Sequence, residues 1–93
     1  MSELLYRTYL YDPITDKENV TYGGHRPLSE SIRGMRDFCR RTNSYKNCMF
    51  IFKPEDPNLR NVYLDTRFKV ISRNKFRELA KRARLKDLLG VST

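Results

Sequence analysis

Histidine, cysteine and long apolar runs are all scarce in this sequence. His25 is the only histidine, so a histidine-based acid–base pair or metal site has no second histidine to complete it. Cys39 and Cys48 are the only cysteines, and they form no CxxC motif. We therefore predict no metal, no cofactor and two reduced, mostly buried thiols, with a disulfide or a redox role as the alternative.

No apolar run approaches the roughly 18 to 20 residues that a membrane-spanning helix needs. The first six residues also lack the basic start and the small-residue cleavage site of a signal peptide. A chain of 93 residues can build one modest core, but not a core together with an elaborate buried active site. These features predict a single cytoplasmic domain over residues 1–93 that makes no contact with a membrane.

Acidic residues are almost missing from one segment near the end of the chain. Nine of the ten charged residues from Arg67 to Lys86 are basic, and the net charge of this segment, +8, equals that of the whole chain. Residues 1–32, in contrast, hold three bases and five acids. A cationic segment on a small folded domain is typical of proteins that bind a polyanion, most often a nucleic acid.

The apolar pattern and the turn residues predict the order ββαββα. The expected strands are Leu4–Tyr11, Asn19–Tyr22, Cys48–Lys53 and Asn61–Leu64, the last continuing with a bend through Thr66–Ile71. The first expected helix has apolar residues at Leu28, Ile32, Met35 and Cys39, with Ser29 as its N-cap, and the second begins after Ser72, which caps it. This order predicts an α+β fold, with an antiparallel sheet of four or five strands and two helices packed on it.

The two halves of the chain, residues 4–46 and 47–89, can be aligned with small insertions. In this alignment Tyr9-Leu10-Tyr11 falls on Phe50-Ile51-Phe52, and Leu28-Ser29 falls on Ile71-Ser72. Either an internal ββα duplication or the chance convergence of two ββα units explains the match.

Basic residues recur at helical spacing in both predicted helices. Arg73, Arg77, Lys81 and Arg84 form a stripe along one flank of the second helix, while Arg33, Arg36 and Arg40 form a similar stripe on the first. Regularly spaced bases can meet successive phosphates, so we expect a basic surface made by both helices. Arg41 and Tyr45 follow directly and join the predicted nucleic-acid site. The alternative is that these charges only solvate two outer helix faces.

The loop Gly23-Gly24-His25-Arg26 leads into the first helix and is a second, weaker candidate site. Backbone N–H groups of a glycine loop can bind phosphate at a helix N-terminus, although a plain connector explains the same residues. A small nuclease based on His25 would need Lys or Tyr as the second catalytic group. We therefore expect no enzymatic activity.

Leu85 falls opposite the apolar face of the second helix, which predicts that this helix ends or bends near Arg84. Leu85, Leu88 and Leu89 then either fold back onto the sheet or contact a protein partner, such as a second copy of the chain.

These features predict a small nucleic-acid-binding module, with RNA favoured over DNA. The alternative is a non-enzymatic inhibitor or adaptor of the kind that bacteriophages carry. Such a protein would bind an acidic surface, or the nucleic-acid channel of a larger enzyme or ribonucleoprotein.

Overall fold

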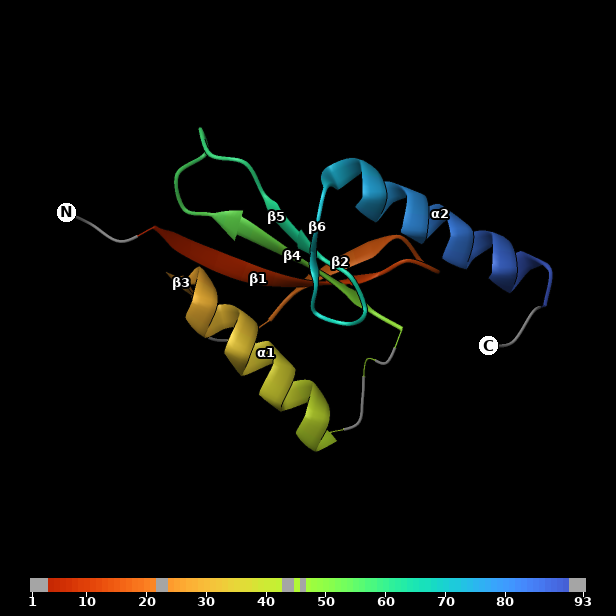
Figure 1. Ribbon diagram of the computed structural model, residues 1–93, viewed down its shortest axis with the longest axis horizontal. Coiled ribbons are helices and arrows are strands. Elements are labelled where there is room, and N and C mark those ends of the chain that lie inside the picture. Colours follow the sequence, from red (N-terminus) through yellow and green to blue (C-terminus); the bar gives the residue numbers. More distant parts are fainter. Residues whose placement is uncertain (1–3, 22–23, 43–44, 46, 91–93) are drawn as a thin grey trace.

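The computed structural model describes residues 4–21, 24–42, 45 and 47–90 (Figure 1). The elements in these ranges are, in chain order, β1 (Leu5–Asp12), β2 (Lys17–Val20), β3 (Arg26–Pro27), α1 (Leu28–Thr42), β4 (Met49–Pro54), β5 (Val62–Leu64), β6 (Val70–Ile71) and α2 (Arg73–Leu88).

The strands form one antiparallel sheet in the order β2-β1-β4-β5-β6, and β3 pairs with the other end of β1. The predicted α+β class is confirmed. The sheet has six strands rather than four or five, because the two-residue strand β3, which was not predicted, also joins it. Strands this short carry no periodic pattern that a sequence could reveal.

β4 lies inside the sheet and is buried on both faces. Its residues Met49 to Phe52 are each at most 6% exposed, which is why the segment reads as an unbroken apolar run rather than an alternating one. Successive side chains point to opposite faces of the sheet. Phe50 and Phe52 therefore face one helix, while Met49 and Ile51 face the other.

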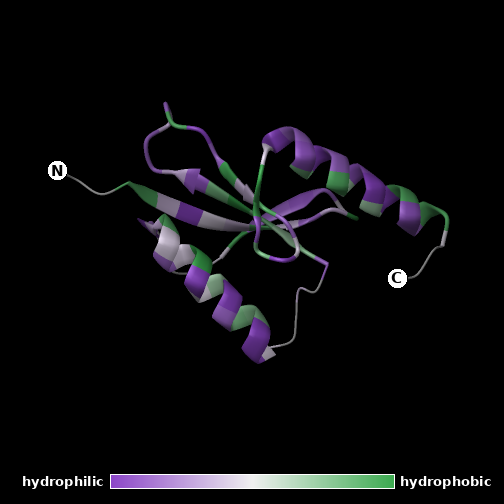
Figure 2. Ribbon diagram, viewed as in Figure 1, coloured by the Kyte–Doolittle hydropathy of each residue, from purple (hydrophilic) through white to green (hydrophobic). Residues whose placement is uncertain are grey.

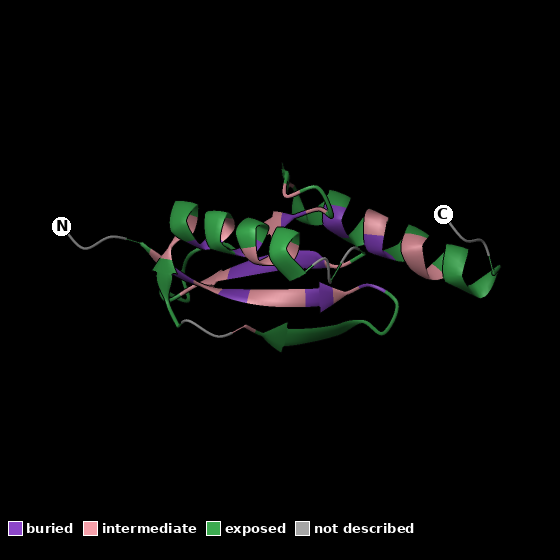
Figure 3. Cartoon of the chain, turned by 90° about the horizontal axis from the view of Figure 1, so that it is seen from below, coloured by how far each residue is buried: buried purple, intermediate pink, exposed green. Residues whose placement is uncertain are grey.

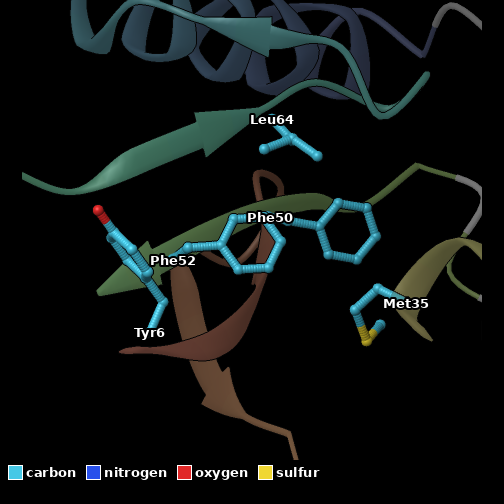
Figure 4. Close-up of a cluster of buried hydrophobic side chains, with 5 residues drawn as sticks. All are labelled: Tyr6, Met35, Phe50, Phe52 and Leu64. Atoms are coloured by element: carbon cyan, nitrogen blue, oxygen red, sulfur yellow. The ribbon is translucent and has the colours of Figure 1, made fainter. Parts of the chain in front are cut away.

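The two helices cover opposite faces of the sheet, with α1 below the strands and α2 above them in Figure 1. The α1 side holds the larger cluster, which includes Met35, Phe50 and Phe52, and Met35 lies beside the Phe50 ring (Figure 4). On the α2 side, Phe76 and Ala80 pack against strand residues that include Tyr11. Each helix thus has its own half of the core.

The first hairpin turns earlier than the sequence suggests. β2 spans Lys17–Val20 instead of residues 19–22, and Tyr22 lies outside the described residues. A four-residue turn separates β1 from β2, and the Asp12 carboxylate accepts a hydrogen bond from the Ile14 N–H there. Asp16 adopts a left-handed conformation (φ 56°), which aspartate tolerates better than most residues.

The predicted cap of the second helix is confirmed, and the predicted cap of the first helix is wrong. Ser72 caps α2, since its hydroxyl accepts a hydrogen bond from the Lys75 N–H at 3.1 Å. Ser29 is already inside α1, which begins at Leu28 directly after β3. Ser29 therefore does not have the extended backbone that an N-cap requires.

The strand expected over Thr66–Ile71 is only Val70–Ile71. The Asp65 carboxylate accepts hydrogen bonds from the backbone N–H groups of Arg67 (2.9 Å) and Lys69 (3.0 Å). These bonds fold residues 65–69, hereafter the β5–β6 turn, into a compact turn.

The two halves share their element order but not their arrangement. The short strand β3 pairs with β1, whereas β6 pairs with β5, and the two helices lie on opposite faces. The internal duplication stays a prediction from the sequence.

Candidate nucleic-acid interface

α2 is held to the sheet along a narrow face, with Phe76 and Ala80 as its buried residues. The Phe76 ring lies 5.0 Å from the ring of Tyr11 and 4.8 Å from that of Tyr63, measured between centroids. Most of the remaining helix surface is open to solvent (Figure 3). A helix anchored in this way presents two flanks and an outer face to a partner.

The exposed surface of α2 carries far more bases than acids. The helix holds seven bases against Glu78 and Asp87, a net charge of +5. Two of the seven bases are ion-paired: Arg82 with Glu78 at 3.0 Å, and Arg84 with Asp16 at 3.8 Å. Within the described ranges, no carboxylate lies at ion-pair distance from the other five, which are Arg73, Lys75, Arg77, Lys81 and Lys86.

Arg84 belongs to the predicted stripe, but its side chain forms hydrogen bonds within the protein. Its guanidinium donates hydrogen bonds to the Tyr11 hydroxyl and to the Pro13 carbonyl, each at 3.1 Å. The Tyr11 hydroxyl in turn donates to the Asp16 carboxylate at 2.5 Å. Burial raises the pKa of Tyr11, and the bond to Asp16 raises it further. These contacts fix the second half of α2 against the β1–β2 turn.

Arg73, Arg77 and Lys81, the rest of the predicted stripe on α2, are exposed on the same flank as Arg84. Arg73 also borders a hollow of about 710 Å³ beside β5 together with Arg60. These three bases are open to a partner.

The opposite flank of α2 borders a larger hollow of about 760 Å³, hereafter the α2 hollow. Lys75, Arg82 and Lys86 lie on its helix side, and Arg67 of the β5–β6 turn also lines it. The spacing of the three helix residues in the sequence is enough to place them on one flank of a helix. It could not show that Arg67 joins them, because the path of the β5–β6 turn depends on the hydrogen bonds of Asp65.

The lining of the α2 hollow includes apolar side chains. Met49, which is 2% exposed, and the partly buried Leu79 and Ala83 line it, together with Ile14 of the β1–β2 turn. Asp65 and Asp87 also line the hollow, so bases outnumber acids by four to two. The α2 hollow therefore combines apolar surface with excess positive charge.

The basic stripe of α1 does not join that of α2. Arg33, Arg36 and Arg40 are exposed, but α1 covers the other face of the sheet. The guanidinium carbon of Arg36 lies 5.9 Å from the ring centroid of Phe68 in the β5–β6 turn. The expected basic surface formed by both helices is therefore wrong, because the helices lie on opposite sides of the sheet.

Arg41 and Tyr45, predicted beside the α1 stripe, lie at and beyond the end of α1. Arg41 is exposed in the last turn of the helix. Tyr45 is 43% exposed and stacks on Phe38, with 6.0 Å between ring centroids. Its ring thus has one aromatic partner within the protein.

The glycine loop before α1 shows little of the predicted phosphate site. Gly23 lies outside the described residues, Gly24 has a positive φ of 65°, and His25 is exposed. Arg26 forms an ion pair with Glu30 at 3.2 Å, and Glu30 places a negative charge in the first turn of α1. A carboxylate at this position opposes the binding of an anion.

The other chemistry-bearing residues form no recognisable centre. In the part of the chain that the structure describes, no three His, Cys, Asp or Glu residues are grouped so that they could hold a metal ion. Cys39 and Cys48 are free thiols, and burial raises the pKa of each. Neither described helix is both long and apolar enough to cross a bilayer.

The end of α2 differs from the prediction. The helix does not end or bend near Arg84 but continues to Leu88, and the N–H of Leu89 donates to the Leu85 carbonyl. Leu85, Leu88 and Leu89 are 50%, 81% and 77% exposed, so they do not fold back onto the sheet. They form an apolar tip on a hydrophilic helix (Figure 2).

Comparisons of this chain with models of protein families, with curated proteins and with solved structures found no match.

Proposed function

We propose that this protein is a non-enzymatic nucleic-acid-binding module that grips the phosphate backbone through α2. The observation that carries the proposal is the charge of this helix: five of its seven bases have no ion-pair partner among the described residues. A face that only solvates a helix commonly pairs Lys with Glu one turn away. α2 has one such pair, between Glu78 and Arg82.

The bases that we assign to binding lie on both flanks of α2. Arg73, Arg77 and Lys81 line one flank, and Lys75 and Lys86 line the other. Arg84 is left out of this set because it holds Tyr11 and Pro13. Phosphate contacts of this kind supply affinity without reading the base sequence, so RNA and DNA should both bind. Between the two, we propose that RNA is preferred.

The test compares equal charge changes on the two helices. We expect the double variant Arg77→Gln/Lys81→Gln, and separately Lys75→Gln/Lys86→Gln, to weaken binding to a labelled oligonucleotide about tenfold or more at low salt. Arg33→Gln/Arg40→Gln is the matched control, since it removes the same charge from the other face of the sheet. Binding measured by fluorescence anisotropy should change much less for this control. Equal losses for all three variants would reject α2 as the interface.

A second function, binding to a protein, is favoured by the apolar tip. Leu85, Leu88 and Leu89 stay exposed beside bases of α2, so the tip suits a partner with both acidic and apolar side chains. A protein that binds such a partner corresponds to the inhibitor or adaptor predicted above.

Changing the tip distinguishes this function from the first. The variant Leu88→Ser/Leu89→Ser should keep its nucleic-acid affinity within about twofold but lose any protein partner that wild type retains after nuclease treatment. Loss of nucleic-acid binding in this variant would instead place the leucines in the nucleic-acid interface.

A further inference from the structure

We propose that the α2 hollow receives one unpaired nucleotide, so that the nucleic acid bound by this protein is single-stranded. This inference rests on the proposed function and names its substrate class. It is carried by the arrangement of the hollow, in which bases and apolar side chains line one space.

The basic side chains that line the α2 hollow come from two separate elements. Arg67 belongs to the β5–β6 turn, while Lys75 and Lys86 belong to α2. Within the described part of the chain, none of these three is ion-paired. Cations gathered around a hollow with apolar walls concentrate the positive potential there, which favours an anion such as a phosphate group.

Two of the other three charged residues at the hollow, Asp65 and Arg82, already have partners within the protein. The Asp65 carboxylate accepts two backbone hydrogen bonds and so holds the β5–β6 turn in place. Arg82 is paired with Glu78, but both side chains are at least half exposed. Exposed pairs of this kind are weak, so a phosphate can compete for the guanidinium.

The apolar lining decides between a single strand and a duplex. Ile14 and the partly buried Leu79 and Ala83 offer apolar surface to a flat ring, and the volume of about 760 Å³ lies within the range of small-molecule sites. The nucleobases of a duplex are stacked inside the double helix. The phosphates of a duplex can therefore meet the basic side chains of the hollow, but its nucleobases cannot reach the apolar lining. An unpaired base can leave its strand and enter the hollow.

The experiment uses the whole chain and labelled oligonucleotides of about twelve nucleotides, single-stranded and as the matching duplex. Wild type should bind the single strand at least tenfold more tightly. Ile14→Ser removes apolar lining at a residue that is already 42% exposed, and should weaken single-strand binding by about five- to fiftyfold while leaving duplex binding unchanged. Leu59→Ser is the matched control, because Leu59 is 37% exposed in a loop outside the hollow.

A second variant reports the position of the nucleotide. The chain has no tryptophan, so Thr66→Trp places a single indole at the α2 hollow. Its fluorescence should be quenched by the single strand, because a base in the hollow stacks on the indole. Asn58→Trp, in the exposed β4–β5 loop, should not be quenched.

The outcomes separate this inference from the proposed function. Equal affinity for single strand and duplex, or no effect of Ile14→Ser together with no quenching in Thr66→Trp, would overturn the inference while α2 still binds nucleic acid. Absence of binding to any oligonucleotide at low salt would overturn the proposed function itself. Quenching of the Thr66→Trp variant by poly-glutamate but not by oligonucleotides would assign the hollow to an acidic protein instead.

Discussion

At the scale of single residues, Arg84 and Tyr11 show how a surface charge becomes part of the fold. The Tyr11 hydroxyl lies between Asp16 and Arg84 and bonds to both. We expect Tyr11→Phe to lower the free energy of unfolding by about 1 to 2 kcal/mol, because both hydrogen bonds involve a charged group. Urea denaturation measures this loss. Tyr9→Phe, on the same face of β1, is the control and should change stability by less than about 0.5 kcal/mol.

The same contacts predict a dependence on pH. Since the pKa of Tyr11 is raised in the folded protein, the unfolded chain loses this proton first as the pH increases. The stabilisation is therefore complete below the unfolded value of about 10 and is lost as the pH rises from there through the folded pKa. The stability difference between wild type and Tyr11→Phe should shrink from pH 8 to pH 11. A difference that grows over this range would contradict the assignment.

The sequence revealed Arg84 as a charge but not its role. Its partner Tyr11 lies 73 residues earlier, and no local spacing indicates such a contact. The helix end predicted near Arg84 was wrong, and of the two alternatives for the leucines, folding back onto the sheet is the one that the exposure of Leu88 contradicts. α2 continues to Leu88 because its last residues favour the helical conformation, although its last apolar side chains stay exposed to water.

At the scale of the elements, the two predicted N-caps provide a paired test. Ser72 satisfies a free N–H at the start of α2, so Ser72→Ala should cost about 1 kcal/mol of stability. Ser29 lies within α1, so Ser29→Ala should cost less than about 0.5 kcal/mol. Thermal unfolding followed by circular dichroism measures both. A larger loss for Ser29→Ala would show that the start of α1 is wrongly placed.

The long elements were predictable because their residues agree with their local structure. The aromatic-rich segment of β1, the apolar run of β4 and the Ser72 cap each specify an element from nearby residues. The face of the sheet that each helix covers was not predicted, because it depends on the path of the connection that leads to the helix. The unbroken apolar run of Met49–Phe52 was the available signal, because a strand that is buried on both faces needs cover on both.

At the scale of the whole molecule, the placement of the helices determines how charge is distributed. Opposite faces of one sheet separate the stripe of α1 from the bases of α2. The acidic β1–β2 turn lies next to α2, where Asp16 pairs with Arg84. The net charge could be counted from the sequence, but its division between two faces required the fold.

The most direct test of α2 as a nucleic-acid interface is the salt dependence of binding. Each phosphate neutralised on a single strand contributes about −0.7 to the slope of log affinity against log salt concentration. With up to five bases in contact, wild type should show a slope of roughly −2 to −3.5, and Arg77→Gln/Lys81→Gln should reduce its magnitude by about 1.4. A flat dependence for wild type, or a slope that this variant leaves unchanged while Arg33→Gln/Arg40→Gln reduces it, would contradict the account.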